Sequence, residues 1–182
     1  ITPRTALARL RKGNDRFINN LRSNRDLLAQ VNETRDGQWP FATILSCIDS
    51  RTSAELIFDQ GLGDIFSVRI AGNIVNTDIL GSMEFACKVA GSKLIVVLGH
   101  TRCGAIKGAC DGVEMGHLTG LLAKIGPSVQ AVDRVGEGVV GFEPGQILAA
   151  LPISGAYAEF ICLPEREWVA VPSGLDAAEA VS

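Results

Sequence analysis

The chain of 182 residues lacks long hydrophobic runs and has no excess of basic charge. Its longest apolar runs, such as residues 94–98, hold five or six residues, whereas a membrane-spanning helix needs about 20. Seventeen basic and twenty acidic side chains give a formal net charge of −3, and nucleic-acid-binding domains normally show a basic excess instead. We therefore expect neither a membrane span nor a nucleic-acid partner.

Cysteine is also sparse. The five cysteines are too few and too scattered for a disulfide framework, and their odd number leaves at least one thiol unpaired. We therefore expect a reducing, cytoplasmic environment. No signal peptide is visible, but the chain begins at Ile1 and not at Met, so the sequence also allows for a targeting segment that has been removed.

The composition is typical of a globular protein, with 47% hydrophobic and 20% charged residues. The length suits one domain, which we expect to span residues 1–182. An amphipathic pattern over residues 5–20 predicts a helix, and a polar stretch with a short helix follows it. These elements form an expected N-terminal helical arm at about residues 1–36. The region at about residues 136–182 is atypical and short.

Three apolar runs predict short buried strands, at residues 41–45, 65–68 and 94–98. Helical patterns alternate with these runs, which favours an α/β fold with a mostly parallel central sheet flanked by helices. In such sheets, functional residues gather outside the carboxyl ends of the strands.

The helix between the second and third strands is predicted over residues 77–90, and Gly91 is a suitable stop for it. After about residue 126 the periodic pattern degrades into a stretch rich in glycine and proline. A hairpin near residues 153–170 is the one element that we expect there. Residues 136–141 fit the G-x-G-x-x-G spacing, but they lack the flanking strand and helix that a dinucleotide site needs.

Two clusters of reactive side chains follow the first and third predicted strands: Cys47-Ile48-Asp49-Ser50-Arg51 and His100-Thr101-Arg102-Cys103. Two thiols and one imidazole are ligands that zinc prefers, and three protein ligands leave a fourth position open for water, as in catalytic zinc sites. Zinc lowers the pKa of such a water and so generates a hydroxide nucleophile. Cys47, His100 and Cys103 are therefore candidate ligands for one Zn²⁺ per chain.

Asp49 and Arg51 leave two interpretations open. The carboxylate can occupy the fourth position and close the site, which describes a non-catalytic protein stabilised by zinc. Alternatively, the neighbouring guanidinium holds the carboxylate, which then orients the zinc-bound hydroxide. Arg51 favours the second interpretation, because its natural partner is the same carboxylate.

These motifs resemble those of the β-class carbonic anhydrases, which carry C-x-D-x-R and, some fifty residues later, H-x-x-C. The resemblance extends from about residue 5 to residue 136. It implies zinc on the two cysteines and the histidine, and Asp49 and Arg51 as a catalytic dyad. The implied reaction is the reversible hydration of CO₂ to bicarbonate and a proton by a zinc-bound hydroxide. A carbonyl sulfide or carbon disulfide hydrolase on the same scaffold is the alternative.

The resemblance also implies how substrate is bound. Gln38 is the amide that places substrate beside zinc, and Phe66, Ala71 and Phe85 line an apolar pocket. A small dry pocket suits CO₂, which has no net dipole. In this family, pocket residues come from two subunits, so we expect a homodimer or a larger even-numbered assembly. Ile44 stands where one branch of the family has a regulatory Trp, so this chain resembles the constitutively open branch.

Other reactive side chains have simpler interpretations. The remaining cysteines are expected in the core, and His117 is expected on the surface. The cysteines in question are Cys87, Cys110 and Cys162.

Overall fold

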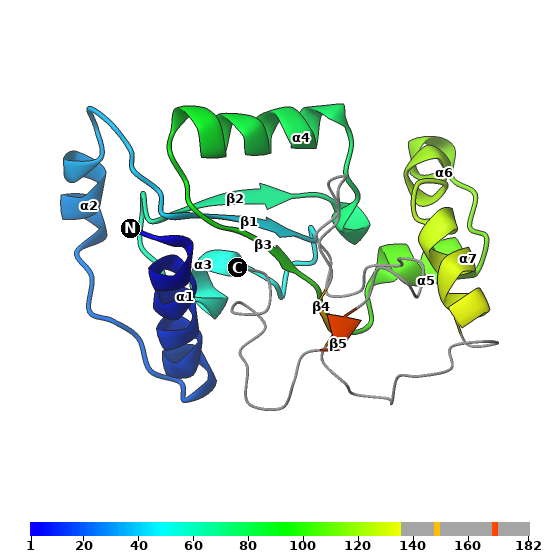
Figure 1. Ribbon diagram of the computed structural model, residues 1–182, viewed down its shortest axis with the longest axis horizontal. Coiled ribbons are helices and arrows are strands. Elements are labelled where there is room, and N and C mark those ends of the chain that lie inside the picture. Colours follow the sequence, from blue (N-terminus) through cyan, green and yellow to red (C-terminus); the bar gives the residue numbers. More distant parts are fainter. Residues whose placement is uncertain (136–147, 150–168, 171–182) are drawn as a thin grey trace. The chain divides into compact units, whose positions relative to one another are not determined.

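A computed structural model describes residues 1–135, 148–149 and 169–170 (Figure 1). The chain divides into two compact units, residues 1–104 and 105–182. The elements of the first unit are α1 (Pro3–Ile18), α2 (Leu27–Glu33), β1 (Ala42–Ser46), α3 (Ala54–Ile57), β2 (Ile65–Arg69), a 3₁₀ turn η1 (Ala71–Asn73), α4 (Thr77–Glu84), a π-helical turn η2 (Phe85–Val89) and β3 (Ile95–Leu98). Those that follow are α5 (Gly104–Cys110), α6 (Gly116–Leu122), α7 (Gly126–Val135), β4 (Leu148–Ala149) and β5 (Val169–Ala170).

The first unit is built on a three-stranded sheet in the order β2-β1-β3. Both neighbours run parallel to β1, with Ala42 opposite Ile65 and Thr43 opposite Ile95. All five residues of β1 are buried, because helices cover the sheet on both faces. This explains why the strand has no charged residue and does not alternate buried with exposed positions. The predicted α/β fold with a parallel sheet is confirmed.

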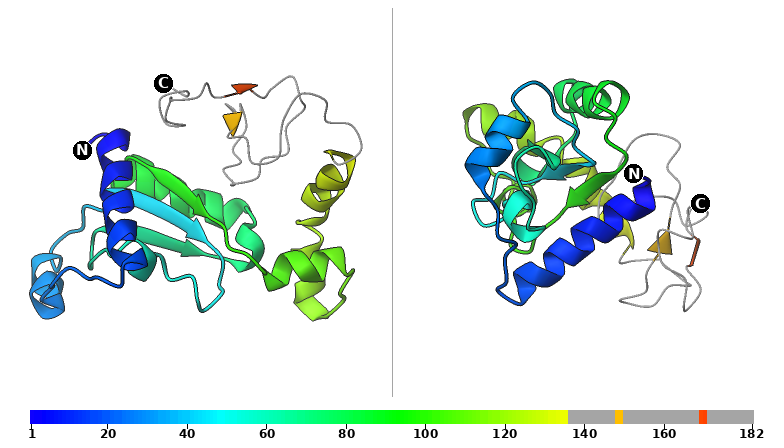
Figure 2. Two further views of the ribbon diagram at one scale, coloured as in Figure 1. Left: turned by 90° about the horizontal axis from the view of Figure 1, so that it is seen from below. Right: turned by 90° about the vertical axis from the view of Figure 1, so that its left-hand side faces the viewer.

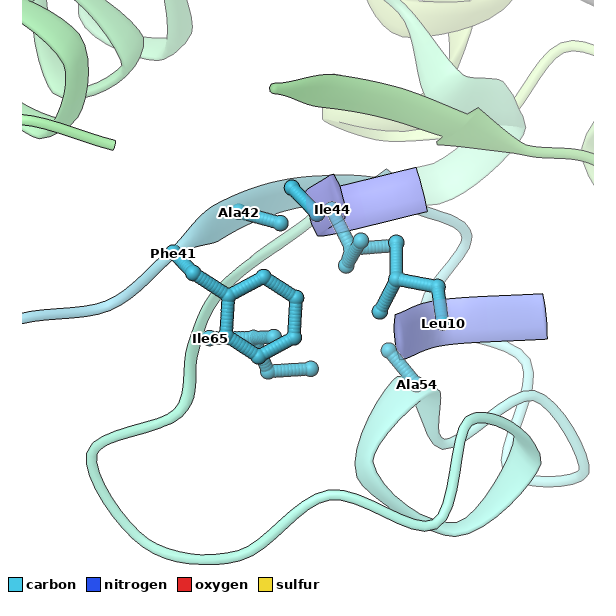
Figure 3. Packing of buried hydrophobic residues seen from close by; sticks show 7 residues of the cluster. Leu10, Phe41, Ala42, Ile44, Ala54 and Ile65 are labelled. Atoms are coloured by element: carbon cyan, nitrogen blue, oxygen red, sulfur yellow. The ribbon is translucent and has the colours of Figure 1, made fainter. Parts of the chain in front are cut away.

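Helices α1 and α3 lie on one face of the sheet, and α4 lies on the other (Figures 1 and 2). Leu10 of α1, Ala54 of α3 and Ile44 of β1 are fully buried and belong to one apolar cluster (Figure 3). Burying a side chain such as Leu or Ile stabilises a fold by about 1.5–3 kcal/mol. The cluster therefore fixes β1, whose carboxyl end carries the first group of reactive residues.

Helix α1 packs closely against the end of α3. A Cβ atom on Gly13 would lie 1.7 Å from the carbonyl oxygen of Phe58, so only glycine allows this approach. The side chain of the next residue, Asn14, donates from Nδ2 to the carbonyl oxygen of Ile57 at 3.1 Å. The N-terminal arm is thus joined to the rest of the first unit through both close packing and a hydrogen bond.

Asp59 forms a second junction between the N-terminal arm and the rest of the first unit. It is 6% exposed, and its carboxylate accepts hydrogen bonds from Arg16, Arg25 and Ser23. Its carbonyl oxygen also accepts from both arginines. Burial raises the pKa of this carboxyl group, while the hydrogen bonds from Arg25, Arg16 and Ser23 lower it, and the lowering prevails. The arm is therefore held by a buried, ionised carboxylate.

The predicted elements of the first unit are confirmed with small shifts. The first helix spans Pro3–Ile18 where residues 5–20 were expected, and each strand lies within one residue of its prediction. The helix predicted over residues 77–90 changes to a π-helical turn at Phe85, where the backbone N–H of Ala90 bonds to the carbonyl oxygen of Phe85. It ends before Gly91, whose φ of 79° suits a glycine stop.

The expectation of no regular pattern after residue 126 was wrong, because α7 spans Gly126–Val135. Pro127 indicated an interruption of the helical pattern, but it lies in the first turn of α7, where proline is tolerated. The hairpin expected near residues 153–170 lies mostly outside the described residues. Among the described ones, the short strands β4 and β5 pair in an antiparallel arrangement. Among the helices that the structure describes, none is both long and apolar enough to cross a membrane.

Candidate metal centre

Three side chains with metal-binding atoms meet at the carboxyl edge of the sheet. Cys47 directly follows β1, whereas His100 and Cys103 follow β3. Their ligand atoms all lie within 4.8 Å of one another, and the two sulfur atoms are 3.9 Å apart. Two thiolates bound to a tetrahedral zinc at about 2.3 Å would lie about 3.8 Å apart. The donor set and its spacing therefore fit this ion.

The orientation of His100 agrees with that fit. Its Nδ1 lies 3.0 Å from the carbonyl oxygen of Thr101, which assigns the ring proton to Nδ1 and leaves a lone pair on Nε2. That Nε2 atom is buried and has no hydrogen-bond partner among the described residues. Since buried polar atoms are rarely left without partners, a metal ion is the simplest explanation for this one.

The surroundings of Cys47 favour its thiolate form. Burial raises the pKa of this thiol, whereas hydrogen bonds from the backbone N–H groups of Gly72 and Asp49 and from Cys103 lower it, and the pKa is lowered overall. Gly72 contributes its N–H from a turn with φ of 67°, a conformation in which glycine avoids strain. The thiolate is the form of cysteine that binds metals.

Asp49 and Arg51 form an ion pair beside this cluster. The Asp49 carboxylate accepts from Nε and Nη2 of Arg51 at 2.9 and 2.7 Å, and from the Arg51 backbone N–H at 3.0 Å. These hydrogen bonds hold the pKa of Asp49 well below its usual range. Its Oδ2 atom lies 3.9 Å from Nδ1 of His100. An ionised carboxylate therefore stands next to the three ligand-capable side chains.

Of the four residues expected to bind substrate, two line one groove and two do not. The rings of Phe66 and Phe85 meet edge to face, with centroids 6.5 Å apart. Both line a groove of about 830 Å³ between β2 and α4–η2, which Arg69 also lines. Gln38 is exposed between α2 and β1, and Ala71 is half-buried at the start of η1. Neither is among the described residues that line the groove.

Sequence reasoning missed Arg69 and Thr52, which bind the main chain of the loop after β1. Nε and Nη2 of Arg69 donate to the carbonyl oxygens of Cys47 and Asp49 at 3.0 and 2.6 Å. The backbone N–H and Oγ1 of Thr52 donate to the same Asp49 carbonyl at 3.0 and 2.9 Å. A side-chain motif gives no signal for these contacts, because every acceptor is a backbone atom.

Three other reactive side chains, those of His117, Cys110 and Cys87, are among the described residues. His117 is exposed as expected. The expectation of core cysteines was wrong for Cys110, which is exposed at the end of α5, and Cys87 is only half-buried. Cys162 lies outside the described residues.

A family model described as carbonic anhydrase matches residues 42–144, more than half of the chain. The chain belongs to the β-class carbonic anhydrases. Over 98 residues it is 48% identical to carbonic anhydrase 2 of Mycobacterium tuberculosis, in an alignment that covers 51% of this chain and 47% of that protein. The chain spans about half the length of the curated relatives it matches.

Solved structures share the fold. The β-carbonic anhydrase CafA of Aspergillus fumigatus superposes with a TM-score of 0.53 and 27% identity, over 60% of this chain and 53% of that one. A β-carbonic anhydrase of Sordaria macrospora, described as tetrameric, gives a TM-score of 0.50 and 30% identity over 60% and 59%. The β-class assignment from the two sequence motifs is confirmed.

Proposed function

We propose that Cys47, His100 and Cys103 hold one zinc ion per chain. The donor set, the sulfur–sulfur spacing of 3.9 Å and the unpartnered Nε2 of His100 support this assignment. When bound, zinc lowers the pKa of a coordinated water, which makes hydroxide available near neutral pH. The protein's part is to hold the two thiolates and the neutral imidazole ready for the ion.

The proposed reaction is the reversible hydration of CO₂ to bicarbonate and a proton. The Asp49–Arg51 ion pair carries this proposal, together with the family assignment. Because Asp49 is ionised, it accepts a hydrogen bond from the reacting water and orients it. Because Arg51 occupies both carboxylate oxygens, Asp49 is held away from the position that the water needs.

Phe66, Phe85 and Ala71 are proposed to form an apolar wall for CO₂, and Gln38 is proposed to donate its amide to a substrate oxygen. In one chain Phe85 is 51% exposed and Gln38 is exposed, so this wall is incomplete. We propose that a second copy completes it, in a homodimer or a larger even-numbered assembly. The tetrameric enzymes of Sordaria macrospora support such an assembly.

Light scattering tests the assembly directly. At micromolar concentration the proposal predicts the mass of a dimer or of a larger even-numbered oligomer. A monomer with full activity would contradict it, because a complete site would then need no second chain.

Stopped-flow measurements with two substrates test the reaction. Zinc-loaded protein is expected to hydrate CO₂ far faster than buffer, and to hydrolyse carbonyl sulfide or carbon disulfide little. Hydrolysis of either sulfur compound without CO₂ hydration would overturn the proposed substrate in favour of the alternative hydrolase. Zinc-loaded protein that is inert toward all three would indicate a non-catalytic zinc protein.

A further inference from the structure

We infer that Arg69 is a positioning residue for the zinc centre, and this inference rests on the function proposed above. Arg69 is the last residue of β2 and lies opposite Ser46, the last residue of β1. Its guanidinium reaches past the end of β1 and binds the carbonyl oxygens of Cys47 and Asp49, at 3.0 and 2.6 Å. It thereby fixes the backbone from which a proposed zinc ligand and the dyad carboxylate project.

The loop after β1 needs this support, because the backbone ladder of the sheet stops there. The last backbone hydrogen bond from the β2 side runs from Ile70 N–H to the carbonyl oxygen of Ser46 at 3.0 Å. Beyond Ser46, the Arg69 side chain supplies the next donors from that side. Thr52 binds the Asp49 carbonyl from within the loop at 2.9 and 3.0 Å. The Asp49 carbonyl is thus held by donors from two separate segments.

An acidic side chain near Arg69 contributes a favourable charge. The Glu55 carboxylate interacts electrostatically with Arg69 and accepts hydrogen bonds from Ser67 Oγ and Ser53 Oγ at 2.5 and 3.3 Å. The guanidinium therefore binds two carbonyl oxygens and also experiences the charge of a fixed carboxylate. A planar guanidinium presents several donors in a rigid fork, whereas the ammonium group of lysine is a point charge on a flexible stem.

By binding these two carbonyl oxygens, Arg69 influences the directions of the Cys47 and Asp49 side chains. Cys47 Sγ and the Asp49 carboxylate leave the same short stretch of backbone, so fixing both carbonyls limits the directions in which they point. Groups that orient metal ligands without touching the metal typically contribute about 10–100-fold to metal affinity or activity. Arg69 is therefore expected to tighten zinc binding without contacting the ion.

The test is the zinc affinity of the metal-free full chain, measured by competition with a chromophoric chelator. Arg69→Met removes both side-chain donors while keeping much of the side chain's length. Its dissociation constant for zinc is expected to rise about 10–100-fold. Arg69→Lys keeps the positive charge but not the forked arrangement of donors. Its zinc affinity is expected to lie between those of the wild type and Arg69→Met.

Arg25→Met is the matched control. It also removes two hydrogen bonds, both to Asp59, in the same unit but away from the metal centre. Its zinc affinity is expected to equal that of the wild type. In cobalt-substituted protein, the absorption band of metal-bound thiolate should change in Arg69→Met and not in Arg25→Met.

The outcomes separate the two proposals. Wild-type protein without saturable zinc binding would overturn the proposed function. Tight wild-type binding together with unchanged affinity in folded Arg69→Met would overturn the role of Arg69 alone. If circular dichroism shows that Arg69→Met does not fold, Arg69→Lys decides, and wild-type affinity in that variant would overturn the inference.

Discussion

Arg51 binds both carboxylate oxygens of Asp49, at 2.9 Å from Nε to Oδ1 and 2.7 Å from Nη2 to Oδ2. Such two-pronged pairs fix geometry as well as charge. The carboxylate is thereby held near His100, 3.9 Å from its Nδ1, while its oxygens are engaged with the guanidinium. In the proposed mechanism this engagement keeps Asp49 an acceptor for water and not a fourth zinc ligand.

Replacing Arg51 with alanine tests that account. Arg51→Ala frees the carboxylate to take the position of the reacting water, so CO₂ hydration should fall by at least about 10–100-fold while zinc is retained. Stopped-flow assays and elemental analysis of the same sample measure both quantities. Arg35→Ala is the control, because Arg35 makes a similar pair with Asp36 on the surface. Near-wild-type hydration by Arg51→Ala would refute the proposed role.

Serine substitutions test the ligand assignment. Cys47→Ser and Cys103→Ser should each lose zinc, because an alcohol is a much weaker ligand for this ion than a thiolate. Cys110→Ser removes an exposed thiol and should keep one zinc per chain. Full zinc occupancy in both of the first two variants, measured by elemental analysis, would show that the metal binds elsewhere.

Asp59 should give the fold a specific dependence on acid. Its pKa in the folded chain is lowered relative to about 3.9 in an unfolded chain. The ionised group therefore stabilises the fold above about pH 4, and this contribution is lost as the pH falls toward the folded pKa. As the pH is lowered from about 5 to about 2, the melting temperature of the wild type should fall more steeply than that of Asp59→Asn. Parallel curves would contradict the prediction.

Gly13 should be intolerant of a methyl group. Gly13→Ala forces a contact with the Phe58 carbonyl, 1.7 Å from the new Cβ, and should lower the free energy of unfolding by at least about 1–3 kcal/mol. Gly120→Ala is the control, since its Cβ would meet nothing within 4 Å in helix α6. That change should be neutral or stabilising by up to about 1 kcal/mol. Urea denaturation in which Gly13→Ala matches the wild type would rule out the close packing.

The sheet and the metal centre were predictable because both depend on short local patterns. A parallel strand buried on two faces is mostly apolar and uncharged, as in residues 42–46, where only Thr43 and Ser46 are polar. Ligand-type side chains follow β1 and β3 directly, and parallel strands bring such positions to one edge. The neighbourhood of Cys47 and His100 therefore followed from the sequence.

The rest depends on contacts between distant segments. The four-residue helix α3 has too few residues to show a period, and it is stabilised by packing against α1. Arg69 acts on backbone carbonyls 20 and 22 residues away, and Asp59 binds arginines 34 and 43 residues away. No periodicity or motif encodes such pairs, because the partners meet only once the chain has folded.

One zinc on Cys47, His100 and Cys103 is proposed to support CO₂ hydration. The most direct test of this proposal is a zinc titration of metal-free protein, with CO₂ hydration measured by stopped flow at each step. The rate is expected to rise in proportion to bound zinc and to saturate at one ion per chain. A rate that stays at the buffer level after one zinc has bound would contradict the proposal.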